Sequence, residues 1–209
     1  MLHEVQTSDI PQASQALADA FRHDPIWNAI CEGEPDVGKR LRAIFELPLR
    51  HGLRFGAVRA ISPNLEGIVA WIPGEHLDMN LWKLIRCRAM GAAMRMGSRV
   101  AKRAGAAFGP VTAYRRRHFT GRAFLYLLVL GVASGQQGKG YGGELIGAAI
   151  EDSERQRLPL YVGAGSDSNV DMYEHFGFEI VERIELPLLG LPNWEMVRRP
   201  SSGRFAAGI

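Results

Sequence analysis

Glycines at alternate positions in the stretch Gln137-Gly-Lys-Gly-Tyr-Gly142 are the residues of this 209-residue chain best suited to hold a ligand. The stretch follows an apolar segment that predicts a strand over 124–132, and it precedes an amphipathic segment that predicts a helix. Glycine has no Cβ, so the backbone can approach a ligand closely. The first N–H groups of a helix lack intrahelical partners and lie at the positive end of its dipole. This pattern predicts a site for a phosphate or pyrophosphate group.

Two common phosphate loops fit this stretch poorly. A Walker loop requires Ser or Thr directly after its lysine, whereas Lys139 is followed by Gly140. A Rossmann fingerprint is formally matched by Gly138, Gly140 and Gly143, but that turn follows its strand almost at once, and here residues 133–136 intervene. A third pattern, Gln/Arg-x-x-Gly-x-Gly, fits from Gln137 onward. A flexible turn without a ligand also remains open.

A second motif lies downstream, where Asn169 precedes Tyr173-Glu-His-Phe-Gly-Phe178. Together the two segments resemble the acetyl-CoA pyrophosphate loop and the later Asn…Tyr-Glu-x-x-Gly-Phe motif of the GNAT superfamily of N-acetyltransferases. Ala20-Phe21…Asp24-Pro25 and Trp194-Glu195-Met196 are similar to a small-molecule or antibiotic-resistance-like branch. The resemblance covers roughly residues 1–198.

The resemblance implies a mixed α/β fold. Its central sheet would be mostly antiparallel, with one splayed parallel strand pair, flanking helices and a helical insertion. Acetyl-CoA would be the co-substrate, and a small molecule with a primary amine would be the acceptor. The implied cofactor-binding residues are Leu130 and Val132 through their backbones, the loop residues Gln137, Gly138, Lys139, Gly140, Tyr141, Gly142 and Gly143, and Asn169 and Tyr173.

Tyr173 is the candidate catalytic residue, because the family's tyrosine faces the departing thiolate. Its free pKa of about 10 is close to that of a thiol, so it can act as a general acid. The general base is left unassigned. The predicted strand over 124–132 carries no carboxylate or histidine, and relatives in this branch often have His where Phe124 stands. Tyr126 and His118 are interpreted as structural.

Two functions compete at this point. The first is direct acetyl transfer from acetyl-CoA to an amine. The second is a non-catalytic acyl-CoA-binding module whose basic insertion recruits an anionic partner. The pairing of Asn169 with Tyr173 favours the enzyme, because a binding module needs no acid.

Charge is distributed unevenly along the chain. The formal net charge is +3, yet residues 79–143 contain twelve Lys or Arg and no Asp or Glu. This block predicts an anionic partner, an acidic surface to pack against, or a solvated face. It also argues against a strongly cationic polyamine as acceptor. The sequence leaves open whether the protein forms a homodimer, and we expect no nucleic-acid partner.

The two cysteines, Cys31 and Cys87, have neither metal-site spacing nor a disulfide framework. We expect reduced thiols in a cytoplasmic protein, with no metal site. No signal peptide or transmembrane segment is evident, since the longest apolar run, residues 123–133, is too short to span a bilayer.

Periodicity predicts one domain over residues 1–198 and a flexible tail over 199–209. We expect strands at 3–6, 57–61, 67–72, 124–132, 159–162, 178–184 and 193–198, and helices at 10–21, from about 35, and at 167–176. A further helix should follow the glycine loop, with Leu145, Ile146, Ala149 and Ile150 on its buried side. Pro48 should kink or end the second helix. A helical insertion over about 75–120 should contain two helices meeting near Gly91.

Overall fold

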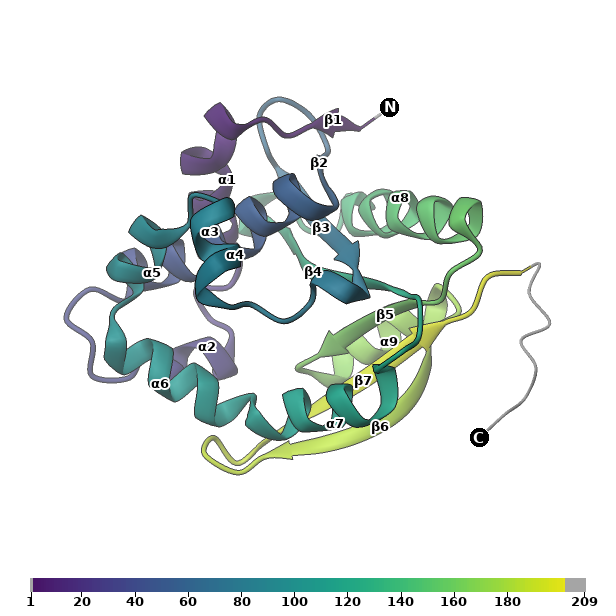
Figure 1. Cartoon of the computed structure of the whole chain (residues 1–209). Coiled ribbons are helices and arrows are strands. Elements are labelled where there is room, and N and C mark those ends of the chain that lie inside the picture. Colours follow the sequence, from purple (N-terminus) through teal and green to yellow (C-terminus); the bar gives the residue numbers. More distant parts are fainter. Residues whose placement is uncertain (1, 202–209) are drawn as a thin grey trace.

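A seven-stranded sheet forms the centre of the computed structural model, which describes residues 2–201 (Figure 1). Its spatial order is β1-β2-β3-β4-β5-β7-β6, and all neighbours are antiparallel except the parallel pair β4 and β5. The predicted fold class is therefore confirmed. The strands are β1 (His3–Glu4), β2 (Ala57–Ala60), β3 (Gly67–Pro73), β4 (Leu125–Val132), β5 (Leu160–Ala164), β6 (Glu179–Leu186) and β7 (Leu191–Arg198).

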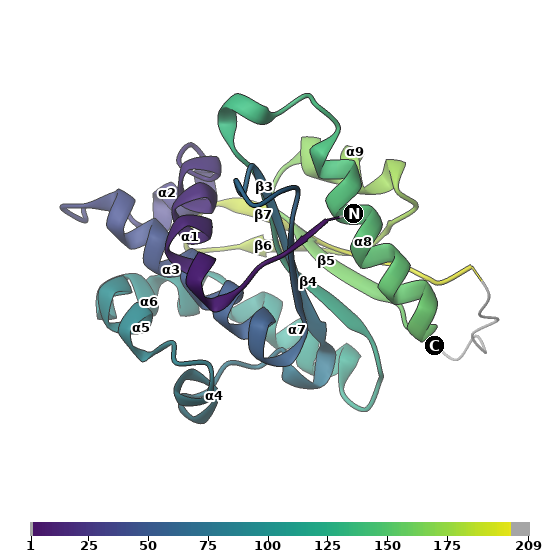
Figure 2. The same ribbon diagram turned by 90° about the horizontal axis from the view of Figure 1, so that it is seen from above.

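Helices cover both faces of the sheet (Figure 2). The helices are α1 (Ile10–Ala20), α2 (Pro25–Ile30), α3 (Val37–Phe55), α4 (Leu81–Arg86), α5 (Met90–Met96), α6 (Ser98–Ala107), α7 (Gly109–Phe119), α8 (Tyr141–Gln156) and α9 (Asp167–His175), with 3₁₀ turns η1 (Thr7–Asp9), η2 (Gly74–His76) and η3 (Ser134–Gln136).

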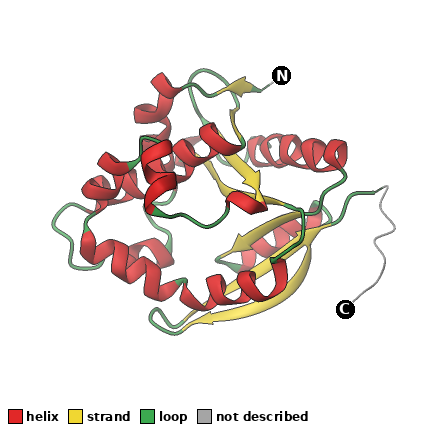
Figure 3. Cartoon of the chain, in the orientation of Figure 1, coloured by secondary structure: helices red, strands yellow, loops and turns green. Residues whose placement is uncertain are grey.

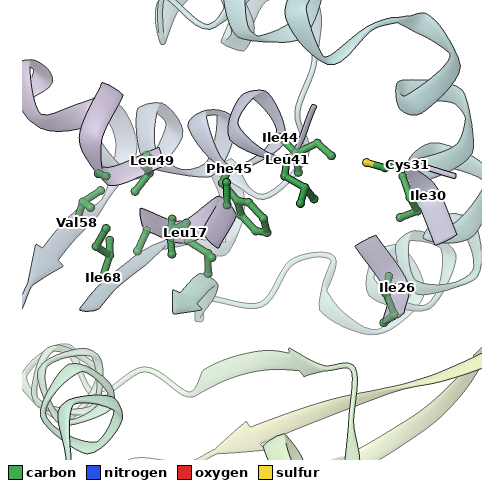
Figure 4. Close-up of a cluster of buried hydrophobic side chains, with 14 of the residues drawn as sticks. Leu17, Ile26, Ile30, Cys31, Leu41, Ile44, Phe45, Leu49, Val58 and Ile68 are labelled. Atoms are coloured by element: carbon green, nitrogen blue, oxygen red, sulfur yellow. The ribbon is translucent and has the colours of Figure 1, made fainter. Parts of the chain in front are cut away.

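Alternation along β3 supplies the two cores. Ile68 and Ala70 pack with α1 and α3, whereas Val69 and Trp71 pack with α8, because successive strand side chains point to opposite faces. In the first core, Leu17, Phe45 and other buried apolar side chains lie between α1, α3 and the sheet (Figure 4).

The central strand β4 contains the irregularity that shapes the site. Trp71 of β3 lies opposite Leu127 and Ala70 opposite Val129, so Leu128 is an extra residue that bulges the ladder. The parallel pairing of β4 with β5 ends at Leu127 and Val162, although both strands continue. The two strands therefore separate beyond this point, as the resemblance implied.

The structure differs from the sequence prediction at α2 and α3. Residues 25–30 form α2, a helix that the sequence analysis does not predict. Asp24-Pro25 is its start, with Pro25 at the first helical position, and Pro48 does not end α3. Helix α3 continues through Pro48, since buried residues on both sides of the proline, including Phe45 and Leu49, pack against the same core.

The insertion between β3 and β4 consists of four helices, α4 to α7, rather than two (Figure 3). Gly91 lies inside α5. The breaks occur at Cys87–Ala89, where Arg88 has a φ of 54°, at Gly97, which has a φ of 84°, and at Phe108. The left-handed backbone at Arg88 and Gly97 interrupts the helical hydrogen bonding at the first two.

The chain end is described as far as Ser201. The backbone N–H of Ser201 donates to Glu154 Oε2 at 2.9 Å, so residues 199–201 lie against the end of α8. The remainder of the predicted flexible tail lies outside the described residues. Within residues 2–201, no helix has the length and apolarity needed to cross a membrane.

Candidate active site

The glycine loop precedes α8 in the conformation that its glycines permit. Gly138 and Gly140 have φ values of 79° and 81°, which residues with a Cβ adopt only with strain. Glu144 N–H makes the first bond of the helix, to the Gly140 carbonyl at 3.2 Å. Among the described residues, no acceptor bonds the N–H groups of 138–143. The loop therefore presents a row of free donors at the positive end of α8.

The edge of β4 that faces away from β3 forms a second wall. Ala133 N–H donates to Glu66 O at 2.8 Å, so Ala133 and every second residue before it bond toward β3. The alternate residues, Leu130 and Val132, direct their backbone groups into the gap beside β5. The Gln137 side chain donates to the Val132 carbonyl at 3.3 Å, so Gln137 must turn away before a ligand can pair there.

A cavity of about 550 Å³ lies between this loop, the open edge of β4, the start of α9 and the α1–α2 connection. It contains most of the residues that the sequence singled out. Its lining consists of Ala20, Phe21, Asp24, Leu130, Gly131, Val132, Gln136, Gln137, Gly138, Gly140, Tyr141, Gly142, Ser166, Ser168, Asn169, Met172 and Tyr173.

Two predicted cofactor residues, Lys139 and Gly143, do not line the cavity. The Lys139 ammonium donates to Gln136 Oε1 at 2.6 Å. A Cβ on Gly143 would lie 3.1 Å from Phe176 Cζ, so this glycine lets α8 approach α9. The geometry gives Gly143 a packing role whether or not its N–H binds a ligand.

Tyr173 lies in the cavity wall with its ring packed against Phe178, at a centroid distance of 5.3 Å. Burial raises the pKa of the Tyr173 phenol, which therefore stays protonated through neutral pH. Within residues 2–201, no protein group bonds the Tyr173 hydroxyl. Every fully buried side-chain nitrogen or oxygen in this part of the chain has a hydrogen-bond partner, so the unbonded Tyr173 hydroxyl is not fully buried. The hydroxyl is thus free to reach a ligand.

Asp24 also lines this cavity, and the sequence analysis does not identify it as a candidate base. Its Oδ1 caps α2 by accepting from the N–H groups of Ile26 at 3.0 Å and Trp27 at 3.1 Å. Burial raises the pKa of the Asp24 carboxyl despite these two donors. A carboxylate held in this way can accept a proton. The Asp-Pro pair signals a helix start, but only the fold brings Asp24 into the same cavity as Tyr173.

The other residues weighed as a base lie elsewhere. Tyr126 is bonded to Arg115 and Glu195, and burial raises its pKa. His118 stacks on Tyr114 at 4.4 Å. Phe124 packs against Phe119, Tyr161 and the backbone of Gly74. Tyr126, His118 and the Phe124 position, where relatives often have His, all lie outside the residues that line the cavity.

A second cavity, of about 700 Å³, lies at the opposite end of β4 and is lined partly by residues 115–124. It contains no residue of the glycine loop and no Tyr173. The helical insertion thus lines this cavity, whereas no residue of 75–120 lines the one with the loop. Two segments are least committed to the sheet and so best placed to choose the acceptor, residues 21–34 and 75–118, and only the first lines the cavity with Tyr173.

Comparisons with known proteins agree with this geometry. Residues 70–178 match the acetyltransferase (GNAT) family. A Schizosaccharomyces pombe protein described as an uncharacterized N-acetyltransferase is 27% identical over 188 residues, which cover 87% of this chain and 75% of that protein.

Solved structures share the fold at lower identity. A Corynebacterium glutamicum protein described as histone acetyltransferase HPA2 and related acetyltransferase is 22% identical, with a TM-score of 0.67 and 98% of both chains covered. The Drosophila melanogaster polyamine N-acetyltransferase, described as forming N-acetylagmatine, is 15% identical with a TM-score of 0.65, covering 95% of this chain and 99% of that one.

Proposed function

The chain belongs to the GNAT family of acetyltransferases, and we propose that it transfers an acetyl group from acetyl-CoA to a primary amine of a small molecule. The observation that carries the proposal is the shared cavity. It joins the free N–H groups of the glycine loop, the open edge of β4, the Tyr173 hydroxyl and the Asp24 carboxyl.

Acetyl-CoA fits the residues present. Free N–H groups at the start of α8 suit its pyrophosphate, because both the donors and the helix dipole favour negative charge. The outward backbone groups of Leu130 and Val132 suit the amide-bearing pantetheine arm, which can add to the strand edge as an extended chain does. Asn169, at the start of α9, lies in the same cavity and supplies a further amide.

The reaction is a direct transfer. Asp24 takes a proton from the ammonium group of the acceptor, and the neutral amine attacks the thioester carbonyl carbon. The C–S bond breaks, the new C–N bond forms, and Tyr173 gives its proton to the departing thiolate. The amine loses its remaining extra proton to solvent, Asp24 releases its proton to solvent, and Tyr173 regains a proton from solvent. Orientation of two bound reactants supplies most of the rate gain, about 7–11 kcal/mol.

Charge in the cavity favours a cationic amine as the incoming acceptor. Asp24 is the one charged residue among those that line the cavity. No arginine of the insertion lines it. The basic segment therefore gives no reason to exclude a polyamine as the acceptor. The polyamine N-acetyltransferase of Drosophila melanogaster is one neighbour with an amine substrate of that kind.

The buried, unbridged thiols of Cys31 and Cys87 are compatible with a reducing cytoplasm, which we propose as the location.

A steady-state assay with acetyl-CoA and a panel of amines, including spermidine, arylalkylamines and amino-acid derivatives, tests the function. Calorimetric titration with CoA tests the loop separately. Replacement of Gly140 by Val should abolish CoA binding, because the Cβ disfavours a φ of 81° and stands between the backbone and the phosphates.

Gly135→Val is the matched control. Gly135 also has open space around it, but it lies outside the cavity and its φ is not positive. A folded Gly140→Val protein with unchanged affinity for CoA would remove the loop from the proposal. Release of free CoA without an acetylated amine would refute the transfer itself.

A further inference from the structure

Exposed apolar side chains are concentrated in one segment. Nine large apolar residues are exposed among those that the structure describes, and six of them lie between residues 79 and 94. We call this set the α4–α5 patch. It consists of Met79, Leu81, Trp82, Ile85, Met90 and Met94.

Helix α4 has its polarity inverted. Lys83, on its inner side, is only 9% exposed, whereas Leu81 is 64% and Ile85 58% exposed. The Lys83 ammonium donates to the carbonyls of His76 at 3.0 Å and Asp78 at 2.7 Å, which anchors the helix to η2. Cys87, one turn on from Lys83, is also buried. Burying apolar side chains is ordinarily favourable, and a group of exposed ones is typical of an interaction surface.

Unpaired cations accompany the patch. The Arg86 guanidinium lies 4.4 Å from the centroid of the Trp82 ring. Neither Arg86, Arg88 nor Arg54 has a carboxylate partner among residues 2–201, and all three are exposed. Two exposed acids lie nearby: Asp78 pairs with Arg116 at 3.8 Å, and Glu75 lies 3.4 Å from a His76 ring nitrogen.

Other arginines of the basic stretch have internal partners. Arg95 pairs with Glu46, Arg99 with Glu34 and Arg115 with Glu195. Part of the basic block thus packs on acidic groups of the fold, as one of the sequence interpretations expected. The cations beside Trp82 are not explained in this way.

We propose that the α4–α5 patch docks the protein on an anionic phospholipid surface. Apolar and aromatic side chains enter the headgroup boundary, and the flanking arginines bind lipid phosphates. Helix α4 projects at the edge of the molecule, away from the sheet (Figure 2). Its six residues span about 9 Å, whereas a standard protein interface uses roughly 20–30 residues a side. The patch residues do not line the cavity with Tyr173, so docking leaves that cavity accessible.

Co-sedimentation with vesicles tests this surface. We expect the full chain to bind vesicles of phosphatidylcholine with phosphatidylserine, but not phosphatidylcholine alone, and to release on addition of salt. The double variant Leu81→Ser/Ile85→Ser should lower the partition coefficient about tenfold or more. Arg86→Gln/Arg88→Gln should weaken binding and flatten its salt dependence. Trp82 fluorescence should shift to shorter wavelength on binding, and Trp82→Phe should remove that shift.

Matched controls keep the test specific. Ile180→Ser/Leu188→Ser removes exposed apolar groups elsewhere, and Arg42→Gln removes an exposed cation of α3, so both should bind as the unmodified chain does. Near-ultraviolet circular dichroism checks that each variant is folded. Failure to sediment with anionic vesicles at low ionic strength overturns the proposal, as does equal loss in the controls. Concentration-dependent dimerisation that Leu81→Ser/Ile85→Ser abolishes would assign the patch to a second copy instead.

Discussion

Tyr173 combines a buried ring with a hydroxyl that no group among residues 2–201 bonds. Its phenol is the acid of the proposed transfer. Burial raises the pKa of this phenol, and the same burial would make a departing thiolate more basic, so the proton transfer stays feasible. Removing the oxygen leaves the packing against Phe178 intact.

Tyr173→Phe should therefore lower kcat about 100-fold or more while leaving the KM for acetyl-CoA nearly unchanged, because only a proton donor is lost. Steady-state kinetics across mildly acidic to mildly alkaline pH measure this. Tyr161→Phe, which removes a hydroxyl outside the cavity, is the control. Undiminished kcat in Tyr173→Phe would exclude it as the acid.

Asp24 serves both the local structure and the proposed chemistry, and the two roles can be separated. Asn caps a helix about as well as Asp, so Asp24→Asn keeps the start of α2 while removing the base. We expect kcat to fall about 100-fold. Asp36 caps α3, where its Oδ1 accepts from the Lys39 N–H. Asp36→Asn makes the same change there and should leave kcat unchanged.

The pH dependence of kcat follows from the direction of the Asp24 pKa. Asp24 is a base only when ionised, and burial raises its pKa, so activity should begin to fall at a higher pH than an ordinary aspartate would cause. This acid limb should be missing in the residual activity of Asp24→Asn. An identical limb in both proteins would assign the titration to another group.

At the scale of elements, helix α3 is held by a close approach to the sheet. A Cβ on Gly52 would lie 2.8 Å from Val58 Cγ2 and 3.2 Å from Ala70 Cβ. Gly38, in the first turn of the same helix, has no such neighbour, since its nearest atom would lie 3.8 Å away.

Gly52→Ala should therefore destabilise the protein by about 1–3 kcal/mol through overpacking, even though alanine favours helices. Gly38→Ala should be neutral or stabilising by up to about 1 kcal/mol. Urea unfolding of both variants gives the two free energies. Equal effects at the two positions would show that helix propensity, not packing, decides the outcome.

At the scale of the whole molecule, one buried ion pair joins the helical insertion to the sheet. Arg115 of α7 bonds Glu195 of β7 at 2.8 Å, and this glutamate is fully buried. Asn193 and Tyr126 also bond Glu195, beside Gly163 of β5.

Arg115→Met should lower the free energy of unfolding by about 3–5 kcal/mol, because it leaves a buried carboxylate uncompensated. The double variant Arg115→Met/Glu195→Met should lower the free energy of unfolding by less than Arg115→Met alone does. Arg116→Met, at an exposed pair 3.8 Å from Asp78, should change stability by at most about 1 kcal/mol. Similar losses in the two single variants would mean that the buried pair does not anchor the insertion.

Much of the element order was readable from the sequence, because it depends on neighbours along the chain. A short apolar run indicated β3, and the glycine spacing indicated the start of α8. The resemblance to the GNAT superfamily supplied the sheet architecture. Local patterns misled where distant contacts outweigh them. Packing on both sides of Pro48 carries α3 through the proline, and residues with left-handed backbone, Arg88 and Gly97, divide the insertion.

The sequence by itself determined which residues can form a phosphate-binding loop, since glycine spacing and helix polarity are local properties. Only the tertiary structure decided what faces that loop. The bulge at Leu128 opens β4 from β5, and the fold brings Asp24 into the same cavity as Tyr173. It also buries Lys83 and turns Leu81 outward. These outcomes depend on contacts between segments far apart in the chain, which no local pattern encodes.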